Sequence, residues 1–252
     1  MQFLETTTQG EERMRRFFID QALVLNAKIR LSPEETKHAA RVLRLQPGAE
    51  VILLNGKGLE AMARLLSLDF EGAEAEILEI NKVTKPIRLE LLQAPLKGPK
   101  MDWLVEKATE LGVDAIHPAR TARTSPFVEK EDRWARIAQA AVKQSGNANF
   151  PELHPAQSLE QAITSLPPNS ARILLQPGAE LALHEAILRS KRAGAKVVIL
   201  AIGPEGGFDE AEEEKLIAAG FLAASLSKQV LRGETAALAA LAIAAHCIDF
   251  SA

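Results

Sequence analysis

Three short polar segments of the chain each follow a stretch of residues that is typical of a buried β-strand. They are QPGA at residues 176–179, GPEGG at 203–207 and SKQVLRGE at 227–234. In an open parallel sheet, ligands bind at the carboxyl ends of the strands, where such loops come together. We therefore expect these three segments to form one binding site.

The middle segment is the most informative of the three. Residues 197–202 are apolar and mostly β-branched, as in a strand buried on both faces, and three glycines and a proline follow within five residues. Glycine permits positive φ angles and lets the backbone approach a ligand closely. The spacing fits neither the G-x-G-x-x-G pattern nor a P-loop. A strand-to-helix turn without any ligand explains this loop, taken alone, equally well.

Acidic side chains open the helix that we expect after this loop, at Asp209, Glu210, Glu212 and Glu213. They suit the positive amino end of a helix, but they repel a phosphate that would otherwise bind there. The pattern therefore predicts a ligand without phosphate groups. Farther on, Arg232 and Glu234 directly precede TAALAALAIAAH, a helix so apolar that it must be buried in the domain or against a second subunit.

The predicted secondary structure follows two different patterns in two parts of the chain. Residues 14–82 carry short strand patterns (RRFFID, AEVILLN, EAMARLLSL, AEAEILEI) and a helix opened by Ser32 and Pro33, which together suggest a small barrel. After a linker at residues 83–87, strand and helix patterns alternate over residues 88–252, as in a parallel α/β domain. Residues 1–13 are predicted to be a disordered extension.

Composition excludes several classes of protein. The net charge of −3 excludes a uniformly basic nucleic-acid coat, although eight Lys and Arg face three acids between Arg13 and Arg44. The single cysteine, Cys247, cannot form an intramolecular disulfide and favours a reducing cytoplasm. The five histidines lack the spacing of a metal site. The most apolar run, residues 236–248, is too short to span a bilayer, so we expect no membrane partner.

The combination of IGPEGG and LSKQVLRGETAAL resembles the bacterial RsmE family of small-subunit ribosomal RNA (uracil-N3) methyltransferases, which belong to the knotted SPOUT superfamily. HAARVLRLQPG, KMDWLVEKATELGVDAIHPARTARTS and KQSGNANFPEL extend the resemblance, in the family's order, from Met14 onward. Because several separated motifs agree, the resemblance is more specific than any one of them.

The resemblance implies a PUA-like RNA-binding β-barrel followed by a methyltransferase domain with a deep trefoil knot, and a homodimer packed through the knotted domains. It implies methylation of a uridine at N3 in small-subunit (16S) ribosomal RNA, within the assembled subunit, with S-adenosylmethionine as cofactor. The cofactor residues that it implies are Leu175, Gln176, Gly178, Ile202, Gly203, Gly207, Leu226, Val230, Leu231, Arg232 and Thr235.

The chain departs from the family pattern at a few positions. Ser227 and Gln229 stand where the family usually has Gly and Arg, Lys143 and Asn147 replace an acid and a base, and Ala122 replaces an acid. These departures leave room for a paralogue that modifies another nucleotide. A ribose 2'-O-methyltransferase of the same superfamily and a non-catalytic RNA-binding module therefore remain as alternatives.

Methyl transfer to uracil N3 requires the loss of a weakly acidic proton, which a base or a cation near the developing anion would assist. We hypothesise that Arg232 stabilises the anion or the target phosphate, and that Glu205 or Glu234 accepts or relays the proton. Either carboxylate could instead bond loop amides. Phosphate contacts, which add affinity without sequence information, are expected from Arg15, Arg16, Arg41, Arg44, Lys97, Lys100 and Arg123, although each alone could be a solvated surface charge.

Overall fold

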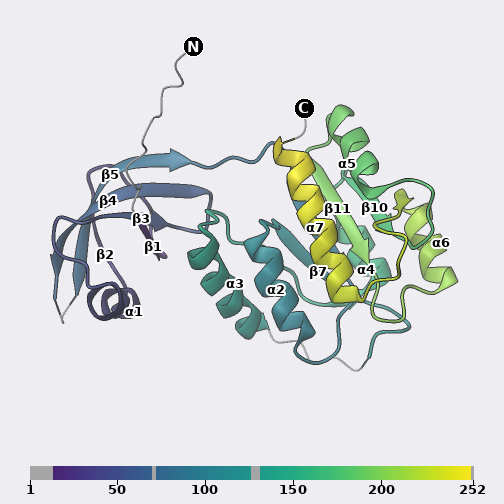
Figure 1. Ribbon diagram of the computed structural model, residues 1–252, viewed down its shortest axis with the longest axis horizontal. Helices are drawn as coiled ribbons and strands as arrows, with labels where there is room; N and C mark the ends of the chain where they lie inside the picture. The colour runs from purple at the N-terminus through teal and green to yellow at the C-terminus, as the bar shows by residue number, and fades with distance from the viewer. Residues whose placement is uncertain (1–13, 70–71, 126–130, 251–252) are drawn as a thin grey trace, which may run out of the picture. The chain divides into compact units, whose positions relative to one another are not determined.

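The computed structural model describes residues 14–69, 72–125 and 131–250. They form two compact units, which divide between Val83 and Thr84, and each unit is described by itself (Figure 1). The predicted disordered extension at residues 1–13 lies outside the described residues.

The first unit is built on a five-stranded sheet with Phe17, Leu53, Leu65 and Ile77 in its core. β1 pairs with β3 in parallel and the other neighbours are antiparallel. Within the described residues the hydrogen-bonded ladder ends at β1 and β2, so closure into the expected barrel stays a prediction. The strand order is β1 (Arg15–Phe18), β3 (Glu50–Leu54), β4 (Leu59–Leu68), β5 (Ala73–Lys82), β2 (Lys28–Arg30).

The helix of this unit begins as its sequence predicts. Ser32 is the N-cap of α1 (Pro33–Lys37), where its hydroxyl accepts a hydrogen bond of 3.2 Å from the Glu35 amide. Pro33 stands at the first helical position, where its missing amide hydrogen costs nothing. A wider turn, η1 (His38–Val42), continues the helix, and Arg44 then leaves it with a φ of +53°.

The second unit contains a sheet of seven strands in which every pairing is parallel. This confirms the predicted parallel α/β domain. The pattern AASLS predicts a strand at residues 223–227, whereas β12 begins two residues earlier, and no pattern predicts the short strands β8 and β9. The order is β12 (Phe221–Ala224), β10 (Ala171–Leu175), β11 (Val197–Ile202), β6 (Arg88–Gln93), β7 (Ala115–Arg120), β8 (Glu152–Leu153), with β9 (Gln157–Ser158) also paired to β7.

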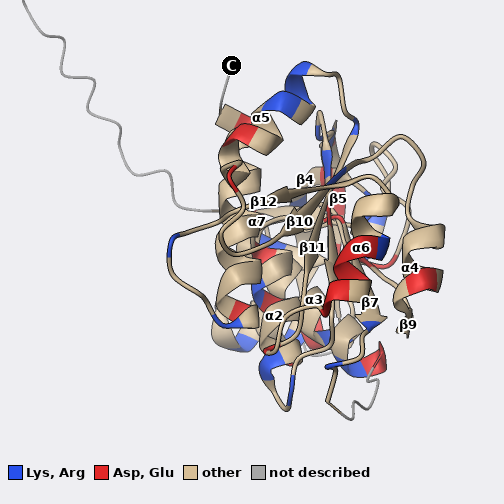
Figure 2. Ribbon diagram, turned by 90° about the vertical axis from the view of Figure 1, so that its right-hand side faces the viewer, with Lys and Arg blue, Asp and Glu red and all other residues tan. Residues whose placement is uncertain are grey.

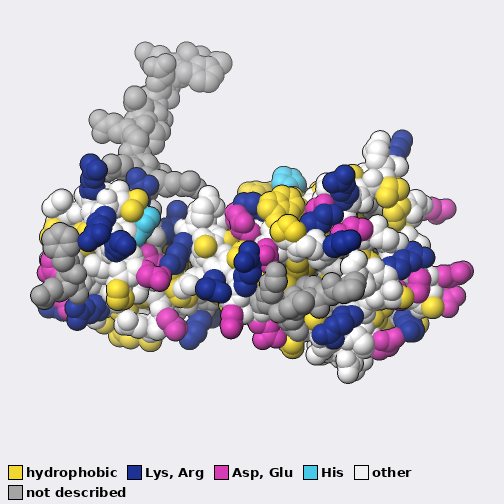
Figure 3. All heavy atoms as spheres, turned by 90° about the horizontal axis from the view of Figure 1, so that it is seen from below, with side chains coloured by type: hydrophobic (Ala, Val, Ile, Leu, Met, Phe, Trp, Pro, Cys, Tyr) yellow, Lys and Arg dark blue, Asp and Glu magenta, His cyan; other side chains and the backbone are white. Residues whose placement is uncertain are grey.

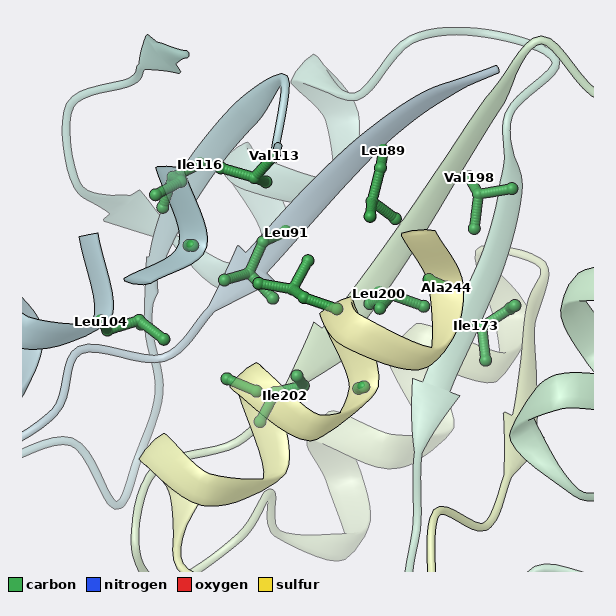
Figure 4. Packing of buried hydrophobic residues seen from close by; sticks show 14 of the residues in the cluster. Leu89, Leu91, Leu104, Val113, Ile116, Ile173, Val198, Leu200, Ile202 and Ala244 are labelled. Carbon is green, nitrogen blue, oxygen red and sulfur yellow. The ribbon is translucent and has the colours of Figure 1, made fainter. Parts of the chain in front are cut away.

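Helices cover both faces of this sheet. Figure 4 shows apolar side chains of β6, β7, β10 and β11, such as Leu91, Ile116, Ile173 and Leu200, directed toward the helices of one face. A second cluster with Leu92, Ile199 and Leu216 fills the other face. The first face carries α2 (Lys100–Glu110), α3 (Glu131–Ser145), α5 (Leu183–Arg192) and α7 (Gly233–Phe250), and the second carries α4 (Leu159–Ser165) and α6 (Glu210–Ala218).

Helix α7 is longer than the apolar run that predicts it, with 18 residues from Gly233 to Phe250. By length and composition it could therefore cross a membrane, contrary to the expectation that it is too short, although an apolar core helix has the same properties. Ala237, Leu241 and Ala244 are buried against the sheet, so we interpret α7 as a core helix. The Lys191 ammonium of α5 donates to the Ile248 carbonyl at 2.8 Å, which favours the negative end of α7.

Candidate functional site

The carboxyl ends of four neighbouring strands lie together at one edge of the large sheet. Leu175 of β10 pairs with Ala224 of β12, and Gln93 of β6 pairs with Ile202 of β11. The loops that leave β10, β11 and β12 enclose a cavity of about 260 Å³. The structure therefore brings the three predicted segments to one place.

Most of the predicted cofactor residues line this cavity, together with Glu205. Gly178, Arg232 and Thr235 are outside the lining, and so is Glu234, although its neighbours Gly233 and Ala236 belong to it. Other lining residues were not among the predicted cofactor residues: Phe208, which follows the glycine loop, Glu213, which was predicted only to open the next helix, and Ser227 and Gln229, which lie in the third predicted segment. Of the predicted residues, those in the lining are Leu175, Gln176, Ile202, Gly203, Gly207, Leu226, Val230 and Leu231.

Close backbone contacts explain two of the glycines. A Cβ atom on Gly203 would lie 2.9 Å from the carbonyl carbon of Gly207 and from the amide nitrogen of Phe208, because the loop folds back on itself. A Cβ atom on Gly233 would lie 2.9 Å from Leu96 Cδ2 and 3.4 Å from the Gly203 carbonyl oxygen. Gly207 has a φ of +71°, which favours glycine. The loop walls of the cavity thus leave no room for side chains at these contacts.

The charged side chains in the cavity lining are Glu205 and Glu213, and both are acidic. Glu213 Oε2 accepts a 2.7 Å hydrogen bond from Gln176 Nε2, which ties the start of α6 to the end of β10. Figure 2 shows the acidic start of α6, where Asp209 and Glu212 cap the helix reciprocally. This electrostatic environment suits a cation and disfavours a phosphate.

Lys100, at the start of α2, forms ion pairs with two carboxylates of the site. Its Nζ lies 3.3 Å from Glu205 Oε1 and 3.1 Å from Glu234 Oε1. Burial opposes ionisation of Glu205, but its own amide, the Lys97 amide and the Lys100 ammonium hold the pKa of Glu205 below its ordinary value. The hydrogen bond to Glu234 is the largest cause that raises the pKa of Lys100. Glu205 and Lys100 are therefore ionised at neutral pH.

Two buried polar atoms at this edge of the sheet have no hydrogen-bond partner among the described residues: Glu234 Oε2 and Gln93 Oε1. The Gln93 side chain is fully buried beneath the glycine loop, and its Nε2 donates to the Ala94 carbonyl at 2.8 Å. Unpaired buried polar atoms are costly. Their presence beside the cavity is typical of a site that is completed by a ligand.

The predicted RNA contacts of the second unit have different surroundings. The Arg123 guanidinium donates to the carbonyls of Gly206 at 2.7 Å and Phe208 at 3.1 Å, so it holds the glycine loop. Lys100 is engaged by the two carboxylates described above, whereas the Lys97 side chain is exposed and only its backbone amide bonds Glu205. Of these three residues, Lys97 is therefore the one whose charged group is not engaged within the described part of the protein.

The four predicted cations of the first unit lie near its surface. Arg15, Arg41 and Arg44 are exposed, whereas Arg16 is half-buried and its Nε has no partner among the described residues. On the face shown in Figure 3, Lys and Arg side chains are spread over both units with acidic side chains between them. Of the four, Arg41 lines a pocket of this unit together with Arg30 and Lys37, whereas the other three lie outside that lining.

Two of the departures from the family pattern bond each other. The Ser227 hydroxyl donates to the Gln229 carbonyl at 2.7 Å and accepts from the Gln229 amide at 3.1 Å, which fixes a tight turn in the loop before α7. Asn147 is also structural, since its Nδ2 donates to the Thr109 carbonyl at the end of α2. The Arg232 carbonyl accepts from the Ala236 amide at 2.8 Å. The Arg232 side chain is exposed and has no hydrogen-bond or ion-pair partner among the described residues, so the guanidinium is available to a ligand.

Two family models match the chain: one described as an RNA methyltransferase PUA domain, over residues 31–78, and one described as an RNA methyltransferase domain, over residues 83–245. The fold and the site are thus those of an RNA methyltransferase.

Individual relatives narrow the family. Ribosomal RNA small subunit methyltransferase E from Synechocystis is 32% identical over 87% of this chain and 73% of its own length, and that from Bacillus subtilis is 28% identical over 90% and 94%. The crystal structure of the Neisseria gonorrhoeae protein of the same name, bound to S-adenosyl methionine, covers 91% of this chain and 95% of its own at 33% identity, with a TM-score of 0.80. A Legionella pneumophila structure in complex with the same cofactor covers 92% and 97% at 30% identity, with a TM-score of 0.77. The chain belongs to the ribosomal RNA small subunit methyltransferase E family.

Proposed function

We propose that this chain transfers the methyl group of S-adenosylmethionine to N3 of a uridine in small-subunit (16S) ribosomal RNA. The observation that supports the proposal best is the cavity at the ends of β10, β11 and β12, whose charged lining side chains, Glu205 and Glu213, are both acidic. S-adenosylmethionine carries a sulfonium and an ammonium group and no phosphate, so its charge fits this lining. The two relatives bound to the cofactor support the same choice.

Leu175, Ile202, Leu226 and the backbone of Gly203 would hold the cofactor, which supplies an electrophilic methyl group for an in-line displacement. The protein would contribute mainly by positioning the two reactants and by excluding water from the site. The exposed guanidinium of Arg232 would stabilise the uridine anion or its phosphate. A carboxylate, that of Glu205 or that of Glu234, would accept the N3 proton. Gly178 and Thr235 would complete the cofactor site from the ends of the two outer loops.

We propose that the two parts of the chain have different functions. Residues 14–82 would form the closed PUA-like barrel and contact RNA phosphates through their arginines, residues 83–87 would be the linker, and residues 88–252 would form the methyltransferase domain with its trefoil knot. A homodimer through this second domain would cover apolar side chains of α7 that are only partly buried, such as Leu238 and Ile243. A ribosomal substrate would place the protein in the cytoplasm.

Methyl transfer to small ribosomal subunits from cells that lack the modification tests this proposal. The modified nucleotide is mapped after digestion, and free RNA is compared with assembled subunits. We expect N3-methyluridine and a preference for the assembled subunit. A 2'-O-methylated nucleoside would replace the proposed chemistry by that of a ribose methyltransferase. A folded protein that binds no S-adenosylmethionine in calorimetry would instead be a non-catalytic RNA-binding module.

A further inference from the structure

Three segments of the second unit come together at Lys100. The lysine stands at the start of α2, Glu205 belongs to the glycine loop after β11, and Glu234 belongs to the first turn of α7. One ammonium group lies 3.3 Å from the first carboxylate and 3.1 Å from the second. The side chains of Lys100 and Glu205 are about one-third exposed, whereas that of Glu234 is 12% exposed. The lysine therefore joins a surface loop to a nearly buried carboxylate.

We propose that Lys100 is a positioning residue for methyl transfer, which acts as the shared counter-ion of Glu205 and Glu234 and keeps the glycine loop against the start of α7. This inference rests on the proposed function, because the loop that it positions is the proposed cofactor loop. It replaces the expectation that Lys100 contacts RNA phosphates.

Charge balance explains why the position of Lys100 matters. Glu205 Oε1 and Glu234 Oε1 both lie within reach of one nitrogen, so without the ammonium two carboxylates would face each other. Like charges at this separation oppose joint ionisation, and the pair either separates or binds a proton. Among the other charged side chains on these segments, Asp102 bonds Arg133 and Trp134, and neither Lys97 nor Arg232 forms an ion pair with Glu205 or Glu234 in the described part of the chain.

The geometry of the loop explains why such a movement would reach the cofactor. The Glu205 carboxylate also accepts from the Lys97 amide at 3.3 Å, and Gly203 contacts Gly233 closely. A displaced Glu205 would therefore move Gly203–Gly207, five residues that line the cavity. An effect on cofactor affinity should be measurable without RNA, whereas a phosphate contact would act only when RNA is present.

The test is calorimetry of S-adenosylmethionine binding to the full chain without RNA, at neutral pH. We expect Lys100→Met to weaken binding about tenfold and Lys100→Arg to restore most of the affinity. Lys107→Met is the matched control, because Lys107 lies on the same helix, has the same 32% exposure and also pairs with two carboxylates, Glu106 and Glu110, outside the cavity lining. Its affinity should equal that of the wild type.

A double-mutant cycle separates positioning from a simple loss of structure. In the Glu234→Gln background only one carboxylate remains, so Lys100→Met should there cost threefold or less, as expected when the two sites are coupled. Unchanged cofactor affinity in Lys100→Met, with a raised KM for RNA and a lower salt dependence, would overturn the inference in favour of a phosphate contact. A wild-type protein that binds no cofactor would contradict the proposed function itself, which is a different result.

Discussion

Buried polar groups near the amino ends of the parallel strands have hydrogen-bond partners, whereas some of those near the carboxyl ends do not. In the amino half, the Glu90 carboxylate of β6 is 1% exposed and both of its oxygens are bonded, one to Arg88 Nε at 3.2 Å and one to His117 Nε2 at 2.9 Å. At the carboxyl end, Gln93 Oε1 and Glu234 Oε2 are buried without a partner among the described residues. A satisfied network stabilises the fold, whereas a buried polar atom without a partner costs stability.

The difference extends to the groups around each region. The partners of Glu90 themselves have partners: His154 stacks on His117 with ring centroids 4.2 Å apart, and Arg88 bonds Glu152 at 2.9 Å. At the other end the exposed Arg232 has no ion-pair partner in the described part of the chain. Substitutions in the first region should therefore change stability, and those in the second should change binding and turnover.

The largest effect is expected at Arg232. Arg232→Ala should lower kcat on ribosomal subunits by about 10²–10³-fold, the usual loss when one group that stabilises developing charge is removed. Its melting temperature should not change, because the guanidinium bonds nothing in the described protein. The control is Arg189→Ala, an exposed arginine on α5. Turnover on intact subunits equal to that of the wild type would remove Arg232 from the mechanism.

Gly203→Ala should have the next largest effect, a loss of cofactor affinity. The added Cβ atom would overlap backbone atoms of Gly207 and Phe208, and such overpacking costs about 1–3 kcal/mol, or roughly 5- to 150-fold in cofactor affinity. Gly194→Ala is the control at a glycine outside the cavity: its φ of +80° makes the substitution cost stability, but a Cβ atom there has no neighbour within 4 Å, so the cofactor affinity of the folded protein should not change. Calorimetry measures both. An alanine at residue 203 that binds the cofactor normally would contradict the close loop contact.

Glu90→Gln should lower stability and leave cofactor binding unchanged, the reverse of what is expected for Arg232→Ala. Loss of the charge partner of Arg88 and His117 should lower the free energy of unfolding by about 1–3 kcal/mol, without changing the cofactor affinity of the folded protein. Although burial opposes ionisation, His117 and Arg88 lower the pKa of Glu90. Its contribution is therefore present above pH 4.5 and is lost as the pH falls through the folded pKa. In urea titrations the gap between the two proteins should close at acid pH.

Arg123→Met should have a smaller effect on the cofactor site. The variant loses two hydrogen bonds from an exposed guanidinium to the glycine loop, so about 1 kcal/mol, or roughly fivefold in cofactor affinity, is expected. This expectation concerns binding without RNA. If Arg123 instead contacted RNA alone, calorimetry would show no change and only the KM for RNA would rise.

The smallest effect should come from His154. Burial, and then the stacked His117, lower its pKa below 6.5, so the unfolded chain binds the proton more readily than the folded protein does. Stability should therefore fall as the pH drops from 6.5 toward the folded pKa. His154→Phe keeps a stacked ring and removes this titration. The slope of the unfolding free energy over this pH interval should become flatter, and an identical slope would exclude His154 as its source.

Long elements with a clear apolar period were predictable from the sequence, and short ones were not. The pattern EDRWARIAQAAVKQS predicts a helix over residues 131–145, and α3 occupies these residues because Trp134, Ala138, Ala141 and Val142 repeat at helical spacing on its buried face. Strand β2 has three residues and β8 and β9 have two each, which is too few for a pattern. Strand β12 begins earlier than predicted because pairing with β10, rather than the local sequence, determines its limits.

The candidate site was predictable where it follows strand ends and not where it depends on side-chain pairing. The three loops could be located because each one follows an apolar run. Glu213 could have been inferred from its place in the first helical turn after the glycine loop, but nothing local shows that it reaches Gln176. The partners of Lys100 are 105 and 134 residues away in the chain and those of Arg123 are 83 and 85 residues away, so a surface cation was the natural interpretation of both.

The close contact between Gly233, Leu96 and Gly203 has a consequence for biosynthesis. The cavity needs residues 226–236 as its last wall, and α7 fills the core beneath it. A nascent chain that has emerged only as far as β12 therefore has neither a complete core nor a place for the cofactor. Because the core and the cavity both require residues after β12, we expect a chain that ends at Ala224 to bind no cofactor.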